Sequence, residues 1–319
     1  MPMKTLTPQT PILLLAAACL LLGCGREPAP APQGAAAEAA AAPVRALDKA
    51  LFQEVIAAGP VAGEQEISAS AWASAVREAG VLRIGGTRTS FLFSQYDEQD
   101  HSLSGFDAGI YQLLARYILG DASRFELTQI DSATREAVLQ NGQVDAVIAT
   151  YSITDRRREL VGFAGPYFTS RQAILVRRGR DDITAPADLA GRRVATQKGS
   201  TGPGVLREFA PQAATELFAN DTEARAALRQ GRVDAYVTDL TLLLSAAVRS
   251  PGDFQLAGEP FGPEDHYGIG VPRDSDAVPF INAFLQRLVS EGLWQKLWHV
   301  TIGARAGIDV APQPPQIAP

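Results

Sequence analysis

Histidine, cysteine and net positive charge are all scarce in this sequence, and each scarcity excludes a class of function. The chain has three histidines, His101, His266 and His299. They form no HExxH motif and no i, i+4 pair, so we expect no metal site. No GxSxG nucleophile elbow is present either, and we expect no catalytic residue and no cofactor. A formal net charge of −6 and a pI near 5.2 argue against a nucleic-acid partner, because phosphate binding needs a basic surface.

Long apolar runs are also rare, and the one that stands out lies near the N-terminus. Residues 12–22, ILLLAAACLLL, follow Lys4 and have the length of a signal-peptide core, which is too short to span a bilayer. LLGC at residues 21–24 resembles a bacterial lipobox. We therefore predict a signal peptide over residues 1–23 and a lipid on Cys24. The alternative is an ordinary signal peptide followed by an incidental cysteine.

The cysteine count and the composition after Cys24 support this interpretation. Cys19 and Cys24 are the two cysteines of the chain, so cleavage after residue 23 would leave one thiol and no possible disulfide. Residues 25–43 are rich in Ala and Pro, which is typical of a linker without a core. We predict a lipid-bearing tether over residues 24–69 and a protein anchored at the extracytoplasmic face of the cell membrane. No other segment of the sequence approaches transmembrane length.

The remaining sequence has the composition of a folded protein and an alternating pattern of secondary structure. With 46% hydrophobic and 20% charged residues among 319, it is long enough for about two domains. Residues 47–58 are compatible with a short helix, to which we assign no chemistry, and the folded body is expected to begin near residue 70. Strands then alternate with helices, for example VLRIGGT (81–87), GFDAGIYQLLARYILG (105–120), FELTQI (125–130) and, near the C-terminus, FQLAGEPF (254–261), YGIGVP (267–272) and a long helix (276–298). This alternation predicts an α/β fold with parallel sheets.

One stretch occurs twice in similar form. LQNGQVDAVIAT (139–150) and LRQGRVDAYVTD (228–239) both predict the end of a helix, a glycine cap and a buried strand. In open α/β sheets the carboxyl ends of the strands are where ligands bind. Thr150 and Asp239 would then approach one ligand from two similar lobes. The alternative is that the repeated letters are simply a good helix-to-strand connection used twice.

Several motifs recur in the order and spacing of a known family. They are GFD (105–107), ATYSITDRRREL (149–160), GPYF (165–168), DLAGRRVATQKGST (188–201), YVTD (236–239) and YGIGV (267–271). With them the chain resembles, over roughly residues 70–302, the polar amino-acid-binding proteins of ABC importers, bacterial extracellular solute-binding protein family 3. The resemblance implies a type II periplasmic-binding-protein fold. In it two lobes, each a mainly parallel sheet flanked by helices, are joined by a two-segment hinge.

The resemblance also predicts where the lobes begin and end. Lobe 1 is expected to comprise residues 70–170 and 260–302, and lobe 2 residues 171–259. The hinge crossings are expected within 165–172 and 258–268. A Pro-rich tail over residues 303–319 looks unstructured.

Ligand contacts for an amino acid's α-groups follow from the same resemblance, residue by residue. Ala149, Thr150 and Ser152 are implied to bind the ammonium. Arg157 is implied to bind the α-carboxylate, for which a planar guanidinium is suited because it donates two parallel hydrogen bonds. Its neighbours in DRRRE we interpret as solvated charges.

A second set of contacts is expected from lobe 2. Ser200 and Thr201 lie where a helix starts, and free N–H groups there attract an anion such as the α-carboxylate. Asp239 would pair with the ammonium, as the family's aspartate does. The alternative for Asp239 is a helix N-cap before LTLLLSAA.

Two further arginines, Arg88 and Arg135, resemble those of the family's acidic amino-acid binders. Both follow expected lobe 1 strands, and both would suit a second carboxylate, as in glutamate or aspartate. An uncharged glutamine would leave them without a counter-charge, at a cost of about 2–5 kcal/mol. The alternatives are a rim contact for Arg88 and a surface helix residue for Arg135.

These assignments predict a monomeric, lipid-anchored binding protein that closes on an acidic amino acid and hands it unchanged to an ABC permease. The chain also resembles actinobacterial acidic-amino-acid-binding lipoproteins in LFS, SITDRRREL and the Pro-rich tail, which leaves open a sensing role with a membrane sensor as partner. A third alternative is a periplasmic dehydratase on the same fold. Such an enzyme needs an acid or base beside the ligand, and Lys198 is the only one we identify.

Overall fold

The computed structural model describes residues 45–317. The predicted signal peptide, Cys24 and residues 24–44 of the predicted tether lie outside these residues. Within residues 45–317, no helix has the length and apolar character needed to cross a membrane.

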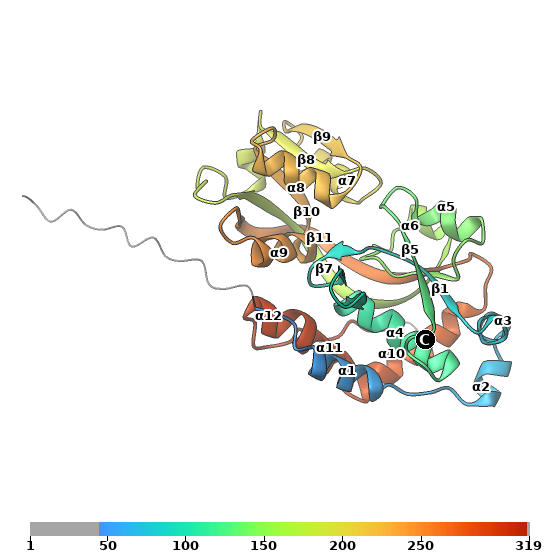
Figure 1. Ribbon diagram of the computed structural model, residues 1–319. Helices are drawn as coiled ribbons and strands as arrows, with labels where there is room; N and C mark the ends of the chain where they lie inside the picture. The colour runs from blue at the N-terminus through green and yellow to red at the C-terminus, as the bar shows by residue number, and fades with distance from the viewer. Residues whose placement is uncertain (1–44, 318–319) are drawn as a thin grey trace, which may run out of the picture. The chain divides into compact units, whose positions relative to one another are not determined.

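An eight-stranded mixed sheet organises the described chain, with strand order β5-β1-β6-β11-β7-β10-β8-β9. Its strands are β1 (Leu82–Gly86), β5 (Phe125–Gln129), β6 (Ala146–Val147), β7 (Gly162–Arg177), β8 (Arg193–Gln197), β9 (Ala214–Phe218), β10 (Ala235–Asp239) and β11 (Phe254–Val271). Strands β5, β1 and β6 pair in parallel, and so do β10, β8 and β9. The two long strands β7 and β11 pair antiparallel and join these two groups (Figure 1). We call the β5-β1-β6 side lobe 1 and the β10-β8-β9 side lobe 2.

Helices flank both lobes. They are α1 (Lys49–Ala57), α2 (Glu64–Ser68), α3 (Ala71–Ala79), α4 (Phe106–Leu119), α5 (Arg135–Gln140), α6 (Asp155–Arg158), η1 (Pro186–Leu189), α7 (Gly202–Phe209), α8 (Asp221–Arg229), α9 (Leu240–Arg249), α10 (Ala277–Ser290), α11 (Leu293–Trp298), η2 (His299–Gly303) and α12 (Ala304–Ala306). A small second sheet holds β2 (Thr89–Ser90), β3 (Ser94–Asp97) and β4 (Ser102–Ser104). The predicted two-lobed α/β architecture is confirmed by this arrangement.

Each lobe has its own apolar core. The lobe 1 core gathers around the buried helix α4 and includes Tyr111, Tyr117 and Trp294. Lobe 2 has two smaller apolar clusters, one containing Val237 and the other Tyr236. Because successive strand residues point to opposite faces of a sheet, these two clusters lie on the two faces of β10.

The repeated sequence corresponds to one helix-to-strand connection used twice. In each copy a glycine with a φ of 65° or 72° follows the helix. The aspartate of Val-Asp-Ala then accepts a hydrogen bond from the backbone N–H of the lobe's first strand. Asp145 accepts from Arg83 at 2.8 Å, and Asp234 accepts from Arg193 at 3.0 Å. The repeated letters therefore serve the connection. The two copies differ in their last residues, since Asp239 ends β10 whereas Thr150 lies in the turn after β6.

Two predicted elements have different limits in the structure. Residues 254–271 form one strand, β11, where the sequence predicted two, because its Gly- and Pro-rich middle still pairs with β7 through register shifts between Ala257 and Ile269. The single helix expected over 276–298 is divided into α10 and α11, because Gly292 adopts a φ of 71°. The predicted lobe limits and hinge crossings remain predictions, although both crossings fall within β7 and β11.

The folded body begins well before residue 70. Residues 45–69, which the sequence placed in the tether, contain α1 and α2, and Phe52, Val55 and Ile56 are buried in the lobe 1 core. At the other end, residues 307–317 carry no helix or strand, yet Ala311 and Ile317 pack against the same core. The Pro-rich tail is thus irregular in backbone but in contact with lobe 1.

We expect Phe52→Ala to lower the free energy of unfolding by about 3–5 kcal/mol, because it removes a large buried side chain and leaves a cavity. Phe52 is 1% exposed, whereas its neighbour Leu51 is 38% exposed. Leu51→Ala is the matched control and should change stability by less than about 1 kcal/mol. Chemical denaturation measures both. An unchanged stability in Phe52→Ala would mean that α1 does not belong to the folded body.

Candidate functional site

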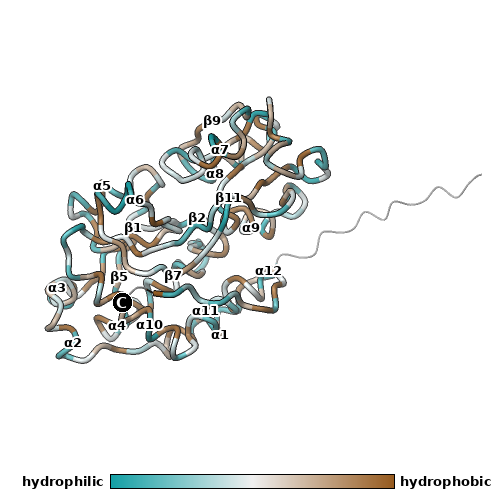
Figure 2. The backbone as a smooth tube through the Cα atoms, turned by 180° about the vertical axis from the view of Figure 1, so that it is seen from behind, coloured by the Kyte–Doolittle hydropathy of each residue, from teal (hydrophilic) through white to brown (hydrophobic). Residues whose placement is uncertain are grey.

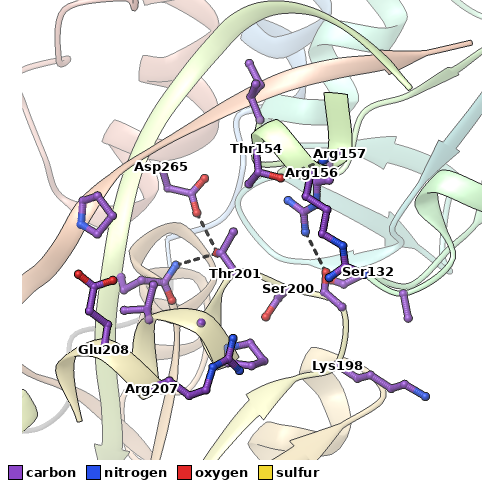
Figure 3. Close-up of a pocket in the computed structure, with 18 of the residues that line it drawn as sticks. Ser132, Thr154, Arg156, Arg157, Lys198, Ser200, Thr201, Arg207, Glu208 and Asp265 are labelled. Atoms are coloured by element: carbon purple, nitrogen blue, oxygen red, sulfur yellow. Dashed lines mark hydrogen bonds between the residues drawn. The ribbon is translucent and has the colours of Figure 1, made fainter. Parts of the chain in front are cut away.

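Two cavities lie between the lobes, at the carboxyl ends of their parallel strands. The first, of about 800 Å³, is lined by Arg157 and Thr154 from lobe 1, Ser200 and Thr201 from lobe 2, and Asp265 from β11 (Figure 3). The second, of about 570 Å³, is lined by lobe 1 residues that include Ser90, Arg135, Ala149 and Thr150, and by lobe 2 residues that include Gln197 and Asn220. Ser132 lines both. The segments around α5 and α6 that border the cavities are hydrophilic in Figure 2.

Arg157 is held in the first cavity by the short helix α6. The Thr154 side chain caps this helix by accepting a hydrogen bond from the Arg157 backbone N–H. The guanidinium is 7% exposed and donates from Nη1 to the Ser152 carbonyl at 2.7 Å. From Nη2 it donates across the cavity to the Gly199 carbonyl at 2.8 Å, and Nε lies 3.4 Å from a Glu136 oxygen. Arg156 and Arg158 are exposed, as predicted for solvated charges.

Arg135 is a buried cation with few partners. It is 4% exposed, and Nη1 donates to the carbonyls of Ala149 at 3.2 Å and Thr150 at 3.4 Å. Its guanidinium lies 4.3 Å from the centroid of the Tyr151 ring, and that of Arg157 lies 5.1 Å from the same ring. Burial, and to a lesser extent the charge of Arg157, lowers the pKa of Arg135 to about 10. Among residues 45–317, no carboxylate forms an ion pair with it and its Nε has no hydrogen-bond partner.

Thr150 and Ala149 lie in a strained turn at the end of the lobe 1 sheet. Thr150 has a φ of 45°, a left-handed conformation that non-glycine residues rarely adopt. Its N–H donates to Asp107 at 2.9 Å, and the Tyr167 hydroxyl donates to the other Asp107 oxygen at 2.8 Å. Burial raises the pKa of Asp107 to about 7. Sequence reasoning missed this role for Asp107, although GFD pointed to the residue.

The carbonyls of Ala149 and Thr150 are engaged differently from the prediction. Both accept from Arg135, whereas the resemblance assigned them to a ligand ammonium. Each carbonyl oxygen has a second lone pair, and both residues line the second cavity. Their contact with a ligand remains a prediction.

Asp239 and Asp265 form a buried acidic pair on the opposite side. Asp239 accepts from the Gln172 side-chain amide and from the Tyr267 hydroxyl at 2.8 Å. Helix α9 begins directly after it, yet its side chain makes no capping hydrogen bond to the helix, so the N-cap alternative does not explain this carboxylate. Burial, and secondly the nearby Asp265, raises the pKa of Asp239 to about 7.

Asp265 and Gln172 belong to the site but were not predicted from the sequence. The Thr201 hydroxyl donates to Asp265 at 3.0 Å, and Gln172 reaches both Thr201 and Asp239. Burial raises the pKa of Asp265, while its hydrogen bond from Ser152 lowers it. Both residues lie on the long strands β7 and β11, where no local motif marks them.

Ser152, Ser200 and Thr201 are all close to this pair. Ser152 is 3% exposed and forms an isolated β-bridge with Tyr267. The Ser200 hydroxyl donates to the Gln197 carbonyl at 2.8 Å. Thr201 is positioned as the N-cap of α7, but its side chain contacts Asp265 and does not cap the helix.

Three predicted ligand contacts line neither cavity: Arg88, Ser152 and Asp239. Ser152 and Asp239 are hydrogen-bonded to the lining residues Arg157 and Gln172, whereas Arg88 is directed elsewhere. Its Nη2 donates to the Leu127 carbonyl at 3.2 Å, and the guanidinium lies 5.2 Å from the centroid of the Tyr96 ring. Thr87 and Thr89 line the second cavity, whereas Arg88, at the bend between β1 and β2, does not. The structure therefore does not bring Arg88 together with Arg135.

Three buried polar atoms at the cavities have no hydrogen-bond partner within the described chain. They are Ser90 Oγ, Arg135 Nε and Gln172 Oε1. Buried polar groups are almost always hydrogen-bonded in native proteins, because an unmade bond costs free energy. All three belong to residues that line the cavities, while the atoms themselves are enclosed by protein. No group of three or more His, Cys, Asp or Glu side chains in residues 45–317 is arranged to hold a metal ion.

The raised pKa of Asp239 predicts how stability changes with pH. Its pKa is about 7 in the fold against an ordinary 3.8. Between these values the folded state binds a proton that the unfolded state does not, so the ligand-free protein should gain stability as the pH falls from 8 to about 5. The contribution is at most about 1.4 kcal/mol per pH unit.

Thermal or chemical unfolding across this pH range, on the unmodified protein and on Asp239→Asn, checks the prediction. The Asn variant should lose part of the pH dependence, and Asp107, with a pKa of about 7, and Asp265, with a raised pKa, should contribute to the remainder. Identical slopes for the two proteins would contradict a raised pKa at Asp239.

Comparisons with known proteins agree with the fold. A family model for bacterial extracellular solute-binding proteins, family 3, matches residues 82–299. The ABC transporter glutamine-binding protein GlnH of Bacillus subtilis is 34% identical over 227 residues, which cover 70% of this chain and 82% of GlnH. The glutamate-binding protein GluB of Corynebacterium efficiens is 36% identical over 215 residues, or 64% of this chain and 73% of GluB. The solute receptor for L-cysteine of Neisseria gonorrhoeae superposes with a TM-score of 0.71 at 27% identity, covering 75% of this chain and 97% of the receptor.

Proposed function

The chain belongs to the bacterial extracellular solute-binding proteins, family 3, and on this premise we propose that it captures glutamate or aspartate outside the cytoplasm for an ABC transporter. Binding of a polar amino acid for ABC import is supported by relatives such as GlnH and GluB. The acidic specificity rests on one observation, which is the buried and incompletely paired guanidinium of Arg135.

The charges of the site are separated as an α-amino acid requires. Arg157 supplies a cation at the first cavity, and its planar head suits an α-carboxylate. Asp239 and Asp265 supply negative charge, and burial raises the pKa of both carboxyls. A ligand ammonium placed beside them would lower both pKa values again. The two poles together match a zwitterion.

Arg135 is a further cation, which remains without a counter-charge after Arg157 binds the ligand's α-carboxylate and the two aspartates bind its ammonium. It shares the Tyr151 ring with Arg157, so the two guanidiniums repel each other. Glu136 and Asp239 act on the charge of Arg135 without forming an ion pair with it, whereas Arg157 lies 3.4 Å from a Glu136 oxygen. A second carboxylate on the ligand would neutralise Arg135, which lines the second cavity. A side-chain amide would leave the charge uncompensated, at a cost of about 2–5 kcal/mol.

The two curated relatives differ in their ligand, since one is named for glutamine and the other for glutamate. Identity of 34% to 36% does not separate them, so the choice depends on the residues that meet the ligand's side chain. Arg135 favours the acid.

The remaining parts of the proposal concern location and fate of the ligand. A lipid on Cys24 would hold the protein at the extracytoplasmic face of the membrane. Cys24→Ser should then move the protein from the membrane fraction to the soluble fraction. We further propose that the ligand is released unchanged, and ligand recovered after incubation, examined by NMR, should show no product.

A thermal-shift screen of the purified protein against the twenty amino acids tests the ligand. A ligand that binds only the folded state raises the midpoint temperature of unfolding. At a ligand concentration a hundredfold above Kd, the free energy of unfolding increases by about 2.7 kcal/mol. Glutamate or aspartate should give the largest rise, and glutamine a much smaller one. Selective stabilisation by glutamine, arginine or cysteine would overturn the acidic assignment.

A further inference from the structure

Gly199, which precedes α7, brings its backbone against the backbone of lobe 1 across the cleft. A Cβ built on Gly199 would lie 2.7 Å from Ala133 Cα, 2.9 Å from Ala133 N and 2.9 Å from Ser132 O. All three are backbone atoms of lobe 1, so no side-chain rotation could relieve the overlap. Any residue larger than glycine would therefore hold the two lobes further apart.

Hydrogen bonds converge on the same contact. Arg157 of lobe 1 donates to the Gly199 carbonyl at 2.8 Å, and the Ser132 hydroxyl lies 3.5 Å from Gln197 Oε1. Figure 3 shows Arg157 reaching from α6 toward the loop that carries Ser200. The guanidinium proposed to hold the ligand's carboxylate thus also joins the two lobes.

This contact lies where the two cavities meet. Ser132 lines both cavities, whereas Gly199 lines the first and Gln197 the second. Gly199 therefore lies at the border between the cavity that holds Arg157 and the cavity that holds Arg135.

We propose that Gly199 is the residue that sets how far the cleft closes, and that its contact with Ala133 retains the bound ligand. The identity of that ligand rests on the proposed function, whereas the contact between the lobes does not. The absence of a Cβ permits backbone-to-backbone closure. Gly199 is accordingly a positioning residue, which acts through the lobes and not on one ligand group. Its loss should weaken all ligands by the same factor.

Gly191 provides a matched control in the same lobe. Both glycines have a positive φ, 79° at Gly199 and 70° at Gly191, so alanine is strained at either position. A Cβ at Gly191 would meet nothing within 4 Å. A difference between Gly199→Ala and Gly191→Ala therefore reports the contact and not the backbone strain.

Closure is measured by electron–electron double resonance between spin labels on the two lobes. Labels at Glu159→Cys and Gln212→Cys, both exposed positions, are introduced into the full chain with Cys19→Ser and Cys24→Ser. Distances are recorded without ligand and with each amino acid at saturating concentration. We expect a short-distance population in the parent protein and in Gly191→Ala, and its displacement to longer distances in Gly199→Ala.

Binding provides the second measurement. If Gly199→Ala reduces the closed population to about a tenth, Kd should rise about tenfold, because apparent affinity scales with the binding-competent fraction. The ratio of glutamate to glutamine affinity should stay as in the parent, and Gly191→Ala should bind normally.

The outcomes separate this inference from the proposed function. Distance distributions that are the same in Gly199→Ala and the parent, or a parent with no short population under any condition, would overturn the role of Gly199. A parent that binds no amino acid but shows the short population, lost only in Gly199→Ala, would refute the ligand and support the contact.

Discussion

Arg157→Ala is expected to abolish measurable binding of every amino acid, whatever its side chain. Arg157 is the buried cation of the first cavity, and its position beside Ser152 and Thr201 places it where an α-carboxylate common to all amino acids would bind. Truncating one partner of a buried charge pair costs about 2–5 kcal/mol, or roughly thirtyfold to several thousandfold in Kd. Arginine at this position also joins the lobes through Gly199, so its loss should remove closure as well as charge.

Titration calorimetry on Arg157→Ala, Arg157→Lys and Arg158→Ala measures this effect. Lysine keeps the charge but loses the planar fork, so it should restore only part of the affinity. Arg158 lies on the same helix and is exposed, which makes Arg158→Ala the matched control, with an unchanged Kd expected. Binding by Arg157→Ala at the parent affinity would mean that the α-carboxylate is held elsewhere.

The sequence predicted those parts of the fold that local patterns determine. Helix α4 ends at Gly120 because that residue adopts a left-handed conformation, and strand β10 ends at Asp239, both at the expected positions. Helix α1 was placed in the tether because it follows an Ala- and Pro-rich stretch. Its apolar residues, such as Phe52, are buried by residues of lobe 1 that lie far away in the sequence. Tertiary packing, and not local propensity, orders this segment.

The same distinction applies to the site. Arg157, Asp239 and Thr201 follow strands or begin helices, so a motif could locate them. Arg157 and Thr201 line the first cavity, and Asp239 lies behind its lining, hydrogen-bonded to Gln172. Asp265 lies in the middle of a long strand that the sequence divided in two, and no pattern marks it.

Arg88 is a residue whose position in the chain was predicted correctly but whose side-chain direction was not. Its place after a lobe 1 strand was correct, but the chain bends at Arg88, and the strand before a bend does not determine where the side chain points. Thr87 and Thr89 occupy the cavity side, and Arg88 contacts Tyr96. A resemblance gives the position along the chain without giving this direction.

This difference between the two arginines leads to the sharpest test of specificity. Arg135→Ala should lower glutamate affinity by roughly thirtyfold or more, the cost of losing a buried counter-charge of about 2 kcal/mol at least. Glutamine affinity should change little, because an amide gains nothing from the cation. The preference for acid over amide would therefore disappear, while overall binding of amino acids would persist.

Arg88→Ala is the control that the structure supplies, since it removes an identical charge from a side chain that lines neither cavity. It should leave both affinities within about threefold, as expected of a substitution outside the contacts of the ligand.

Arg135→Gln, which keeps an amide donor for the Ala149 carbonyl, separates loss of charge from loss of support for the strained turn at Thr150. If glutamate and glutamine weaken equally in both Arg135 variants, the guanidinium supports the turn and does not select the acid. If only glutamate weakens, the charge itself sets the specificity.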